Sequence, residues 1–175
     1  MNTDIDLIAG INSNEGSLLS ALLLPPKDEA LTVDHFKHGV QVADKMFHEL
    51  DVQKVVDYYL KGIDTNNSSA VRRAFYEFFG DLFMKYPTYL FAKQFAINTQ
   101  KSDKNVYFYE LTHHCKTFAQ MIKCDDEMSS TAHAMDLPFV FGMGFTPEMA
   151  QIFSDTDAQF SRDVMKMWTN FAKYG

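Results

Sequence analysis

The sequence has no long hydrophobic run and no cluster of basic residues. Its 175 residues contain no apolar stretch near the roughly 18 residues that mark a membrane-spanning helix, so no membrane span is expected. The formal net charge of −7 argues against nucleic acid as a partner, because its phosphates would be repelled. Cysteine is scarce: Cys115 and Cys124 are compatible both with one small disulfide loop and with two reduced thiols.

The composition is that of a globular protein. Hydrophobic residues make up 46% of the chain and charged residues 22%, so disorder is not expected. The length suggests one domain with one core. Sixteen phenylalanines and ten methionines are many for this length, and much of their surface must be buried.

Two segments are predicted to be β-strands. Residues 5–11 form a nearly continuous apolar run, which is typical of a strand buried on both faces of a parallel sheet. Residues 106–111 are rich in tyrosine and phenylalanine and follow a polar turn. Strands of this kind need more neighbours than the chain supplies, so we expect an incomplete piece of a larger α/β domain.

Helical spacing of apolar residues covers most of the remaining chain. The predicted helical regions are residues 28–61, 70–84, 87–98 and the region from 146 onward. Pro87 suits the first turn of a helix, so the third region is predicted to begin a separate helix there. Residues 62–69, and about twenty residues after the second strand, are polar and are predicted to be loops.

One acidic residue and one histidine lie at positions where catalytic residues are expected. Turn residues at positions 12–14 place Glu15 just after the first predicted strand, at the sheet edge where catalytic groups of α/β proteins gather. His133 precedes a run that is apolar except for Asp136 and that closes in Gly142. A carboxylate that holds a histidine in the right tautomer makes it an effective general base for acyl transfer through serine.

The chain resembles the C-terminal part of a type-B carboxylesterase or cholinesterase over nearly its whole length. The similar segments, in the family's order, are residues 7–16, the Asp81-to-Pro87 junction, 106–109, 131–142 and 168–173. The resemblance implies an α/β-hydrolase fold, mostly helical here, with about two strands of the central sheet. It also implies that residues 1–175 are the C-terminal part of such a domain, without the N-terminal part that holds the nucleophile.

The resemblance implies a role for each residue of the constellation. His133 would be the general base of a Ser-Glu-His triad, Glu15 its orienting acid, and Asp136 a hydrogen-bond partner behind them. No cofactor is implied. The Gly-x-Ser-x-Gly nucleophile elbow and the His-Gly-Gly-Gly oxyanion loop of the family are missing from the sequence, so we expect this chain alone to hydrolyse nothing.

Three aliphatic residues stand where cholinesterases carry aromatic ones. Leu18 and Leu19 follow the acid loop, and Met135 lies two residues after the histidine. Quaternary ammonium groups prefer aromatic faces, so we expect these residues to line a site for a small apolar carboxylic ester rather than a choline ester. Tyr86 replaces a family cysteine, so that interdomain disulfide is not expected.

Two further patterns were weighed. His113, His114 and Cys115, with Cys124 and His133, superficially suggest zinc, but their spacing matches no structural zinc site, so no metal is expected. Asn66 and Asn67 each head an Asn-x-Ser sequon in a predicted loop and are candidate glycosylation sites. Together with the resemblance, they favour a protein of the secretory pathway lumen or the extracellular space.

Competing interpretations remain open at the level of sequence. A lone histidine in an apolar setting is usually structural, and a turn carboxylate such as Glu15 usually only faces water. The leading hypothesis is part of a serine carboxylic-ester hydrolase, and the alternative is a catalytically inactive cholinesterase-like binding or adhesion protein. A dead homologue has no chemical need to keep both Glu15 and His133, which favours the hydrolase. A third possibility is a truncated product without a stable fold. The sequence leaves open the ester and the oligomeric state.

Overall fold

Two parallel strands form the centre of the molecule. The computed structural model describes residues 4–100, 102–122 and 131–175. Strand β1 (Leu7–Asn12) pairs with β2 (Val106–Leu111) along their whole length, from Leu7 opposite Val106 to Asn12 opposite Leu111. The prediction of two strands in an α/β arrangement is confirmed, with the first strand shifted by one or two residues.

Helices fill the connection between the strands and the chain after them. Parallel strands require a long crossover, because the chain must return to the same end of the sheet before it pairs again. The crossover holds α1 (Gly16–Leu19), a 3₁₀ turn (Ser20–Leu22), α2 (Val33–Phe47), α3 (Val52–Tyr59), α4 (Ser68–Gly80) and α5 (Tyr86–Thr99). After β2 come α6 (Lys116–Met121), α7 (Leu137–Val140), a 3₁₀ turn (Met143–Phe145) and α8 (Asp155–Tyr174).

Side-chain caps explain where several of these helices begin. Thr32 caps α2, Asp51 caps α3 and Asn67 caps α4, each by accepting a hydrogen bond from a main-chain amide of the first turn. Ser154 and Asp157 form a reciprocal capping box at the start of α8. The last predicted helical region therefore begins at residue 155 rather than near residue 146.

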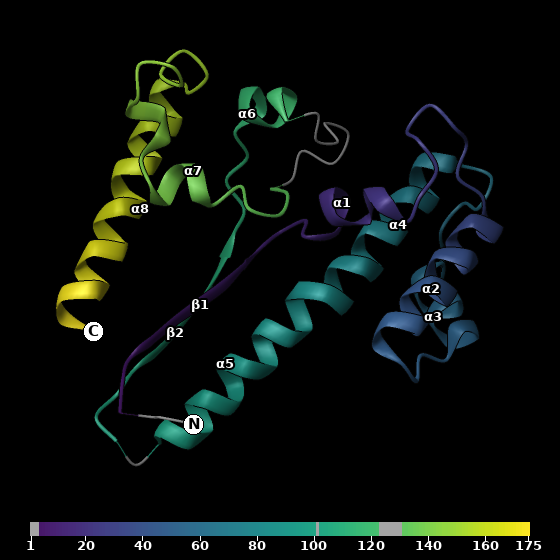
Figure 1. Ribbon diagram of the computed structural model, residues 1–175, viewed down its shortest axis with the longest axis horizontal. Helices are drawn as coiled ribbons and strands as arrows, with labels where there is room; N and C mark the ends of the chain where they lie inside the picture. The colour runs from purple at the N-terminus through teal and green to yellow at the C-terminus, as the bar shows by residue number, and fades with distance from the viewer. Residues whose placement is uncertain (1–3, 101, 123–130) are drawn as a thin grey trace.

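Pro87 lies in the first turn of an α-helix, as predicted, but the predicted break before that helix is absent. Helix α4 continues through a π-helical turn (Asp81–Lys85) into α5, and the three segments form one long rod across the molecule (Figure 1). A proline ring inside an α-helix collides with the carbonyl four residues earlier. The wider π turn just before Pro87 relieves this conflict, so the helix continues instead of stopping. The predicted loop after β2 also contains a short helix, α6.

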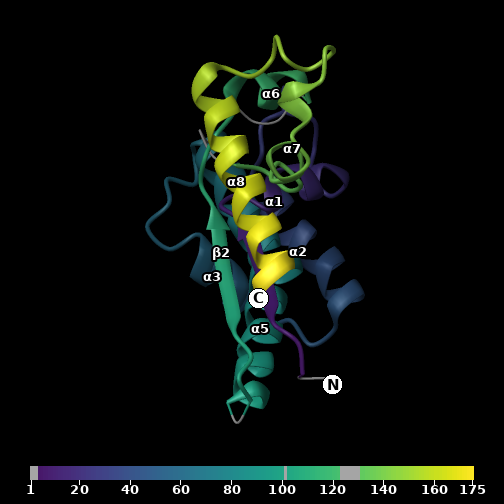
Figure 2. The same ribbon diagram turned by 90° about the vertical axis from the view of Figure 1, so that its left-hand side faces the viewer.

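The two faces of β2 contact different helices. Tyr107 and Tyr109 point to one side, where they meet Phe171 and Trp168 of α8 edge to face. Phe108 points to the other side and meets Tyr89 of α5. This alternation follows from the two-residue period of a strand, and it places α8 and α5 on opposite sides of the strand pair (Figure 2).

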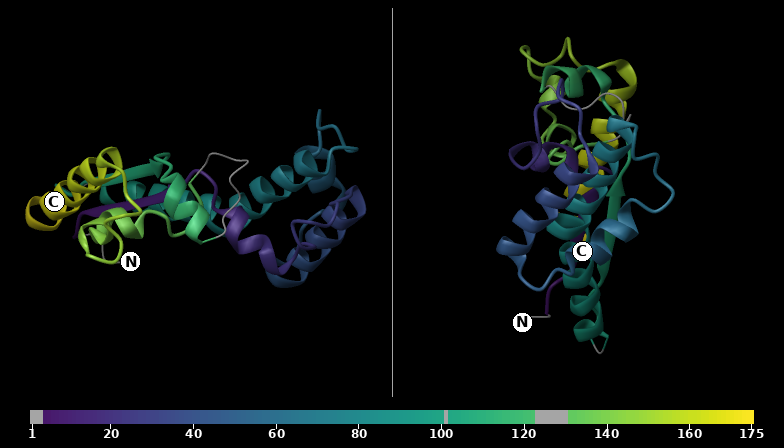
Figure 3. Two further views of the ribbon diagram at one scale, coloured as in Figure 1. Left: turned by 90° about the horizontal axis from the view of Figure 1, so that it is seen from above. Right: turned by 90° about the vertical axis from the view of Figure 1, so that its right-hand side faces the viewer.

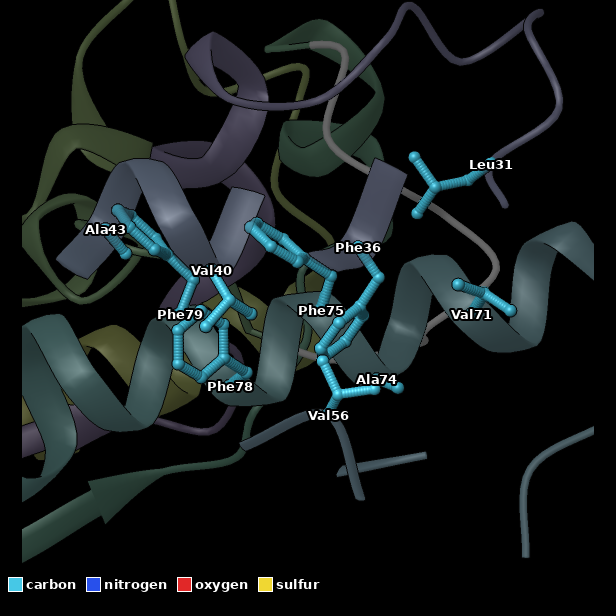
Figure 4. Packing of buried hydrophobic residues seen from close by; sticks show 10 residues of the cluster. All are labelled: Leu31, Phe36, Val40, Ala43, Val56, Val71, Ala74, Phe75, Phe78 and Phe79. Carbon is cyan, nitrogen blue, oxygen red and sulfur yellow. The ribbon is translucent and has the colours of Figure 1, made fainter. Parts of the chain in front are cut away.

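Buried hydrophobic residues form two separate clusters. The α2–α4 cluster consists of Leu31, Phe36, Val40, Ala43, Val56, Val71, Ala74, Phe75, Phe78 and Phe79 (Figure 4). The α6–α8 cluster consists of Leu111, Cys115, Phe118, Ala119, Ala132, Met135, Phe139, Phe153 and Val164. Helix α8 of the second cluster lies at one end of the molecule and α2 and α3 of the first lie at the other, with α6 nearer the middle (Figure 1 and Figure 3). Loops at the carboxyl ends of the strands, together with α1, connect the two ends.

Helix α5 is apolar on most of its surface. Exposed apolar or aromatic residues of this helix are Tyr86, Tyr89, Leu90, Phe91 and Ile97. A helix that is apolar all round normally lies inside a larger structure. No helix in the described parts of the chain has both the length and the apolar character to cross a membrane.

Candidate active site

The structure brings Glu15 and His133 into direct contact, although 118 positions separate them in the sequence. His133 Nδ1 lies 2.7 Å from Glu15 Oε2. The carboxyl group of Glu15 is buried, whereas the His133 side chain is 30% exposed. Because a carboxylate accepts hydrogen bonds, Nδ1 carries the proton and Nε2 is left with its lone pair.

Glu15 is held from both sides. Its second oxygen, Oε1, accepts a hydrogen bond of 2.6 Å from the main-chain amide of Asn12, the last residue of β1. On the other side, Gly16 lies so close to α4 that a Cβ atom there would overlap the carbonyl oxygen of Tyr76. A Cβ on Gly80 of α4 would in turn come within 2.9 Å of the Gly16 amide nitrogen. This glycine contact seats α1 on α4 and fixes the backbone of the acid.

The backbone around His133 is equally constrained. Ala132 and Met135 are 0% and 1% exposed, and the Ala132 amide donates to Met135 Sδ at 3.3 Å. Between them, Ala134 adopts a left-handed conformation with φ of 64°. Such a conformation costs a residue other than glycine about 1–3 kcal/mol, and it persists where the surroundings impose it. The two buried neighbours impose it here and turn the imidazole toward Glu15.

Asp136 lies behind the pair. Among the described residues, no hydrogen bond joins Asp136 directly to Glu15 or to His133. Its Oδ2 accepts from the Tyr109 hydroxyl at 3.2 Å, and its Oδ1 accepts from Asn12 Nδ2 at 3.4 Å. Burial and the nearby Asp136 carboxylate raise the pKa of Tyr109 above its ordinary range, so this tyrosine stays a neutral donor. Asp136 is therefore linked to Glu15 through Asn12.

The three residues predicted to line a substrate site occupy different environments. Leu18 is 39% exposed. Leu19 is half-buried and packs against the α2–α4 cluster. Met135 is buried inside the α6–α8 cluster, because the left-handed turn at Ala134 directs it inward. Among the three, Leu18 is therefore the best placed to contact a ligand in this arrangement.

A second histidine–carboxylate pair, which sequence reasoning missed, connects β2 to α8. His113 Nε2 lies 2.7 Å from Asp157 Oδ1, and its ring stacks on Phe160 with centroids 4.2 Å apart. Burial raises the pKa of Asp157, but hydrogen bonds from Ser154 and His113 outweigh it and hold this pKa below its ordinary value. The capping-box spacing from Ser154 to Asp157 was the sequence signal for the carboxylate.

The zinc pattern dismissed from spacing does not assemble in the described residues. No group of three or more His, Cys, Asp or Glu side chains among them is arranged to hold a metal ion. Cys115 is buried, and burial raises the pKa of its thiol. Cys124 lies outside the described residues, so its predicted alternatives, a disulfide or a free thiol, stay predictions.

An apolar cavity of about 860 Å³ opens between β2 and α8. Tyr107, Trp168 and Phe171 line it, and Asp136 lies at its margin. Neither Glu15 nor His133 contributes to its walls.

Comparison with known proteins places this geometry in a family. The model of the carboxylesterase family matches residues 1–175, the whole of this sequence. The chain belongs to the carboxylesterase family. The predicted relationship and the α/β-hydrolase fold class are thereby confirmed, and the mostly helical architecture with two parallel strands agrees with them.

Individual relatives of this carboxylesterase-family chain share about a quarter of its residues. It is 25% identical to cholinesterase of Mus musculus, over 97% of this chain and 27% of the relative. It is 27% identical to acetylcholinesterase-1 of Trittame loki, over 95% of this chain and 29% of the relative. It is 26% identical to neuroligin-3 of Mus musculus, over 97% of this chain and 20% of the relative. The chain thus spans less than a third of the length of these relatives.

Proposed function

We propose that this chain supplies the acid and the base of a Ser-Glu-His triad in a serine carboxylic-ester hydrolase. The observation that carries the proposal is the 2.7 Å contact between His133 Nδ1 and the buried Glu15 carboxylate, with Nε2 left available. In this proposal residues 1–175 are the C-terminal part of the domain. The serine and the oxyanion donors come from an upstream part.

Each group has a defined step in this proposal. His133 Nε2 takes the proton of the serine hydroxyl while the serine oxygen attacks the ester carbonyl. The protonated imidazole then gives that proton to the leaving alcohol. In the second half of the reaction, water attacks the acyl-serine with the same proton transfers and releases the carboxylic acid product. Glu15 holds the tautomer and stabilises the imidazolium throughout. No cofactor is needed.

The chain alone is expected to be inactive. It has no nucleophile elbow, and the loss of oxyanion donors alone typically costs about 10²–10³ in rate. Exposed apolar residues on α5, such as Leu90 and Phe91, fit the proposal that an upstream part covers this helix. Leu18, at the acid loop, favours a small apolar carboxylic ester as substrate. Leu19 and Met135 stay predicted lining residues of the substrate site. The burial of Met135 weighs against this role for Met135.

The test uses the full-length protein and a fluorophosphonate probe, which labels activated serines. Labelling is expected for the wild type and is expected to disappear in His133→Ala. The matched control is His38→Ala, which removes an exposed histidine of α2 and should label like the wild type. A full-length sequence without an in-frame Gly-x-Ser-x-Gly, or a wild type that does not label, would contradict the proposal.

A cholinesterase-like binding or adhesion protein without catalytic activity is the second candidate. The similarity to neuroligin-3 and the exposed aromatic side chains of α5 favour it. The intact contact between Glu15 and His133 weighs against it, since binding alone does not need this pair. Absence of probe labelling in a folded full-length protein would support this candidate.

We also propose that the protein passes through the secretory pathway. Asn66 and Asn67 are both exposed in the turn before α4. Asn67 already accepts a hydrogen bond from the Ala70 amide as the helix cap, so Asn66 is the better acceptor for a glycan. A mobility shift on enzymatic deglycosylation that Asn66→Gln removes would support this, and an unglycosylated protein that stays in the cytosol of the expressing eukaryotic cell would count against it.

A further inference from the structure

The loop that carries the acid meets the segment that carries the base just beyond the end of the sheet. The Ser13 amide still donates to the carbonyl of Leu111, the last residue of β2, at 3.0 Å. One residue later, the hydrogen-bond partner of the acid loop changes. The Asn14 amide donates to the Thr131 carbonyl at 2.9 Å, and Asn14 forms an isolated parallel bridge with Ala132. The segment before the histidine thus replaces β2 as the neighbour of the acid loop.

Thr131 makes two further hydrogen bonds, and they run in different directions. Its amide donates to Ser13 Oγ at 3.0 Å, which strengthens the contact with the acid loop. Its hydroxyl donates to the His113 carbonyl at 2.8 Å, which ties it to the chain leaving β2. The residue is completely buried, so each of these bonds is protected from competition by water.

We propose that Thr131 is a positioning residue that sets the register between the acid and the base. It lies two residues before His133, so a slip of its segment along the acid loop moves the imidazole relative to Glu15. Hydrogen bonds weaken steeply when distance and angle depart from their optimum, and the contact to be kept is 2.7 Å. The catalytic meaning of this role rests on the proposed function, but the structural effect does not.

The positioning effect depends on the Thr131 hydroxyl as well as on the main-chain hydrogen bonds of Thr131. The bonds to the Asn14 amide and to Ser13 Oγ hold Thr131 against the acid loop, which itself reaches β2 through the Ser13 amide and the Leu111 carbonyl. The Oγ1 contact with the His113 carbonyl adds a direct tie to the chain that leaves β2. Without it, the segment before His133 keeps its link to β2 through the acid loop but loses this direct tie.

Four variants separate positioning from general stability. Thr131→Val removes the hydroxyl and keeps the branched shape, and Thr131→Ser keeps the hydroxyl. Ser13→Ala removes the hydrogen-bond acceptor of the Thr131 amide. This variant provides the test if Thr131→Val does not fold. Thr99→Val is the matched control, since Thr99 is also buried and its hydroxyl also donates to main-chain carbonyls, but within α5.

The measurement is the proton resonance of His133 Nδ1–H in the 175-residue chain, identified by its loss in His133→Gln and Glu15→Gln. We expect Thr131→Val and Ser13→Ala to shorten its exchange lifetime by roughly five- to tenfold, the factor typical of one lost hydrogen bond. Thr131→Ser should restore the wild-type lifetime. Thr99→Val should lower the thermal midpoint and leave the lifetime unchanged.

Two results would overturn the proposal. One is a wild-type lifetime in both Thr131→Val and Ser13→Ala, and the other is a wild-type chain that lacks the resonance altogether. Neither depends on a serine nucleophile. A full-length protein that fails to label with fluorophosphonate would defeat the proposed hydrolase function while the lifetimes still report on positioning.

Discussion

Two histidine–carboxylate pairs of equal length lie in different settings within the described parts of the chain. His133 and Glu15 are 2.7 Å apart at the carboxyl end of the sheet, and His113 and Asp157 are 2.7 Å apart at the junction of β2 and α8. The first pair uses Nδ1 and leaves the distal Nε2 available. The second uses Nε2 and leaves Nδ1, the nitrogen nearer its own main chain.

This difference shows that a short contact does not by itself make a general base. In a triad the carboxylate holds Nδ1, and Nε2 reaches the nucleophile. His113 has the opposite orientation, and its ring lies stacked on Phe160 and edge-on to Phe139. Its partner carboxylate, Asp157, also accepts hydrogen bonds from Ser154, the cap residue of α8. The second pair therefore ties α8 to the chain that follows β2, and of the two pairs the first has the nitrogen arrangement that the proposed triad needs.

The largest expected difference between the pairs is in activity. In the full-length protein, His133→Ala or Glu15→Ala should lower kcat/KM for a small apolar ester by about 10⁴, because the base or its tautomer is lost. His113→Ala should lower it less than about tenfold per folded molecule, since that histidine has no place in the reaction. Initial-rate measurements normalised to folded protein check this, and an equal loss for both histidines would erase the distinction.

Stability should show the reverse order. Asp157→Ala removes the partner of His113 and the side chain that accepts from the Ser154 amide in the capping box of α8, so we expect it to lower the free energy of unfolding by about 1.5–3 kcal/mol. Urea unfolding monitored by Trp168 fluorescence reports this value, because Trp168 packs from α8 onto β2. Asp163→Ala on the exposed face of α8 is the control and should change stability by less than about 0.5 kcal/mol.

The contact between α1 and α4 should matter to the first pair alone. Gly16→Ala places a Cβ against the Tyr76 carbonyl and should cost about 1–3 kcal/mol while displacing Glu15. Gly39→Ala, where a Cβ would overlap the Phe75 ring inside the α2–α4 cluster, is the matched control. Both variants should lose stability, but only Gly16→Ala should shorten the exchange lifetime of the His133 Nδ1 proton. Equal lifetimes in the two variants would mean that the glycine contact does not position the acid.

The smallest effect is a pH dependence of stability that belongs to the second pair. The folded-state pKa of Asp157 lies below its ordinary value, so its stabilising contribution is present above the unfolded-state pKa of about 3.9. That contribution is lost as the pH falls through the lower folded-state pKa. The unfolding free energy of the wild type should therefore fall more steeply than that of Asp157→Asn as the pH drops below about 5. Parallel curves would show that Asp157 has no such role.

Local sequence signals were sufficient to predict the strands and to single out Glu15 and His133 as a candidate acid and base. A continuous apolar run and an aromatic alternating run correctly located β1 and β2, because burial on a sheet leaves a strong local pattern. The break at Pro87 was predicted wrongly because local rules do not anticipate a π turn that accommodates proline. The inward direction of Met135 depends on the left-handed backbone at Ala134, which has no marker in an alanine.

The sequence by itself determined the family, the two strands, and the residue types that stand at 15 and 133, since these depend on local pattern and on order along the chain. Only the tertiary structure decided that the two side chains meet at 2.7 Å, which imidazole nitrogen faces the carboxylate, and that His113 pairs with Asp157. These outcomes depend on contacts between segments far apart in sequence. Parallel pairing of β1 with β2, the close approach of Gly16 to α4, and the hydrogen bonds of Thr131 create those contacts.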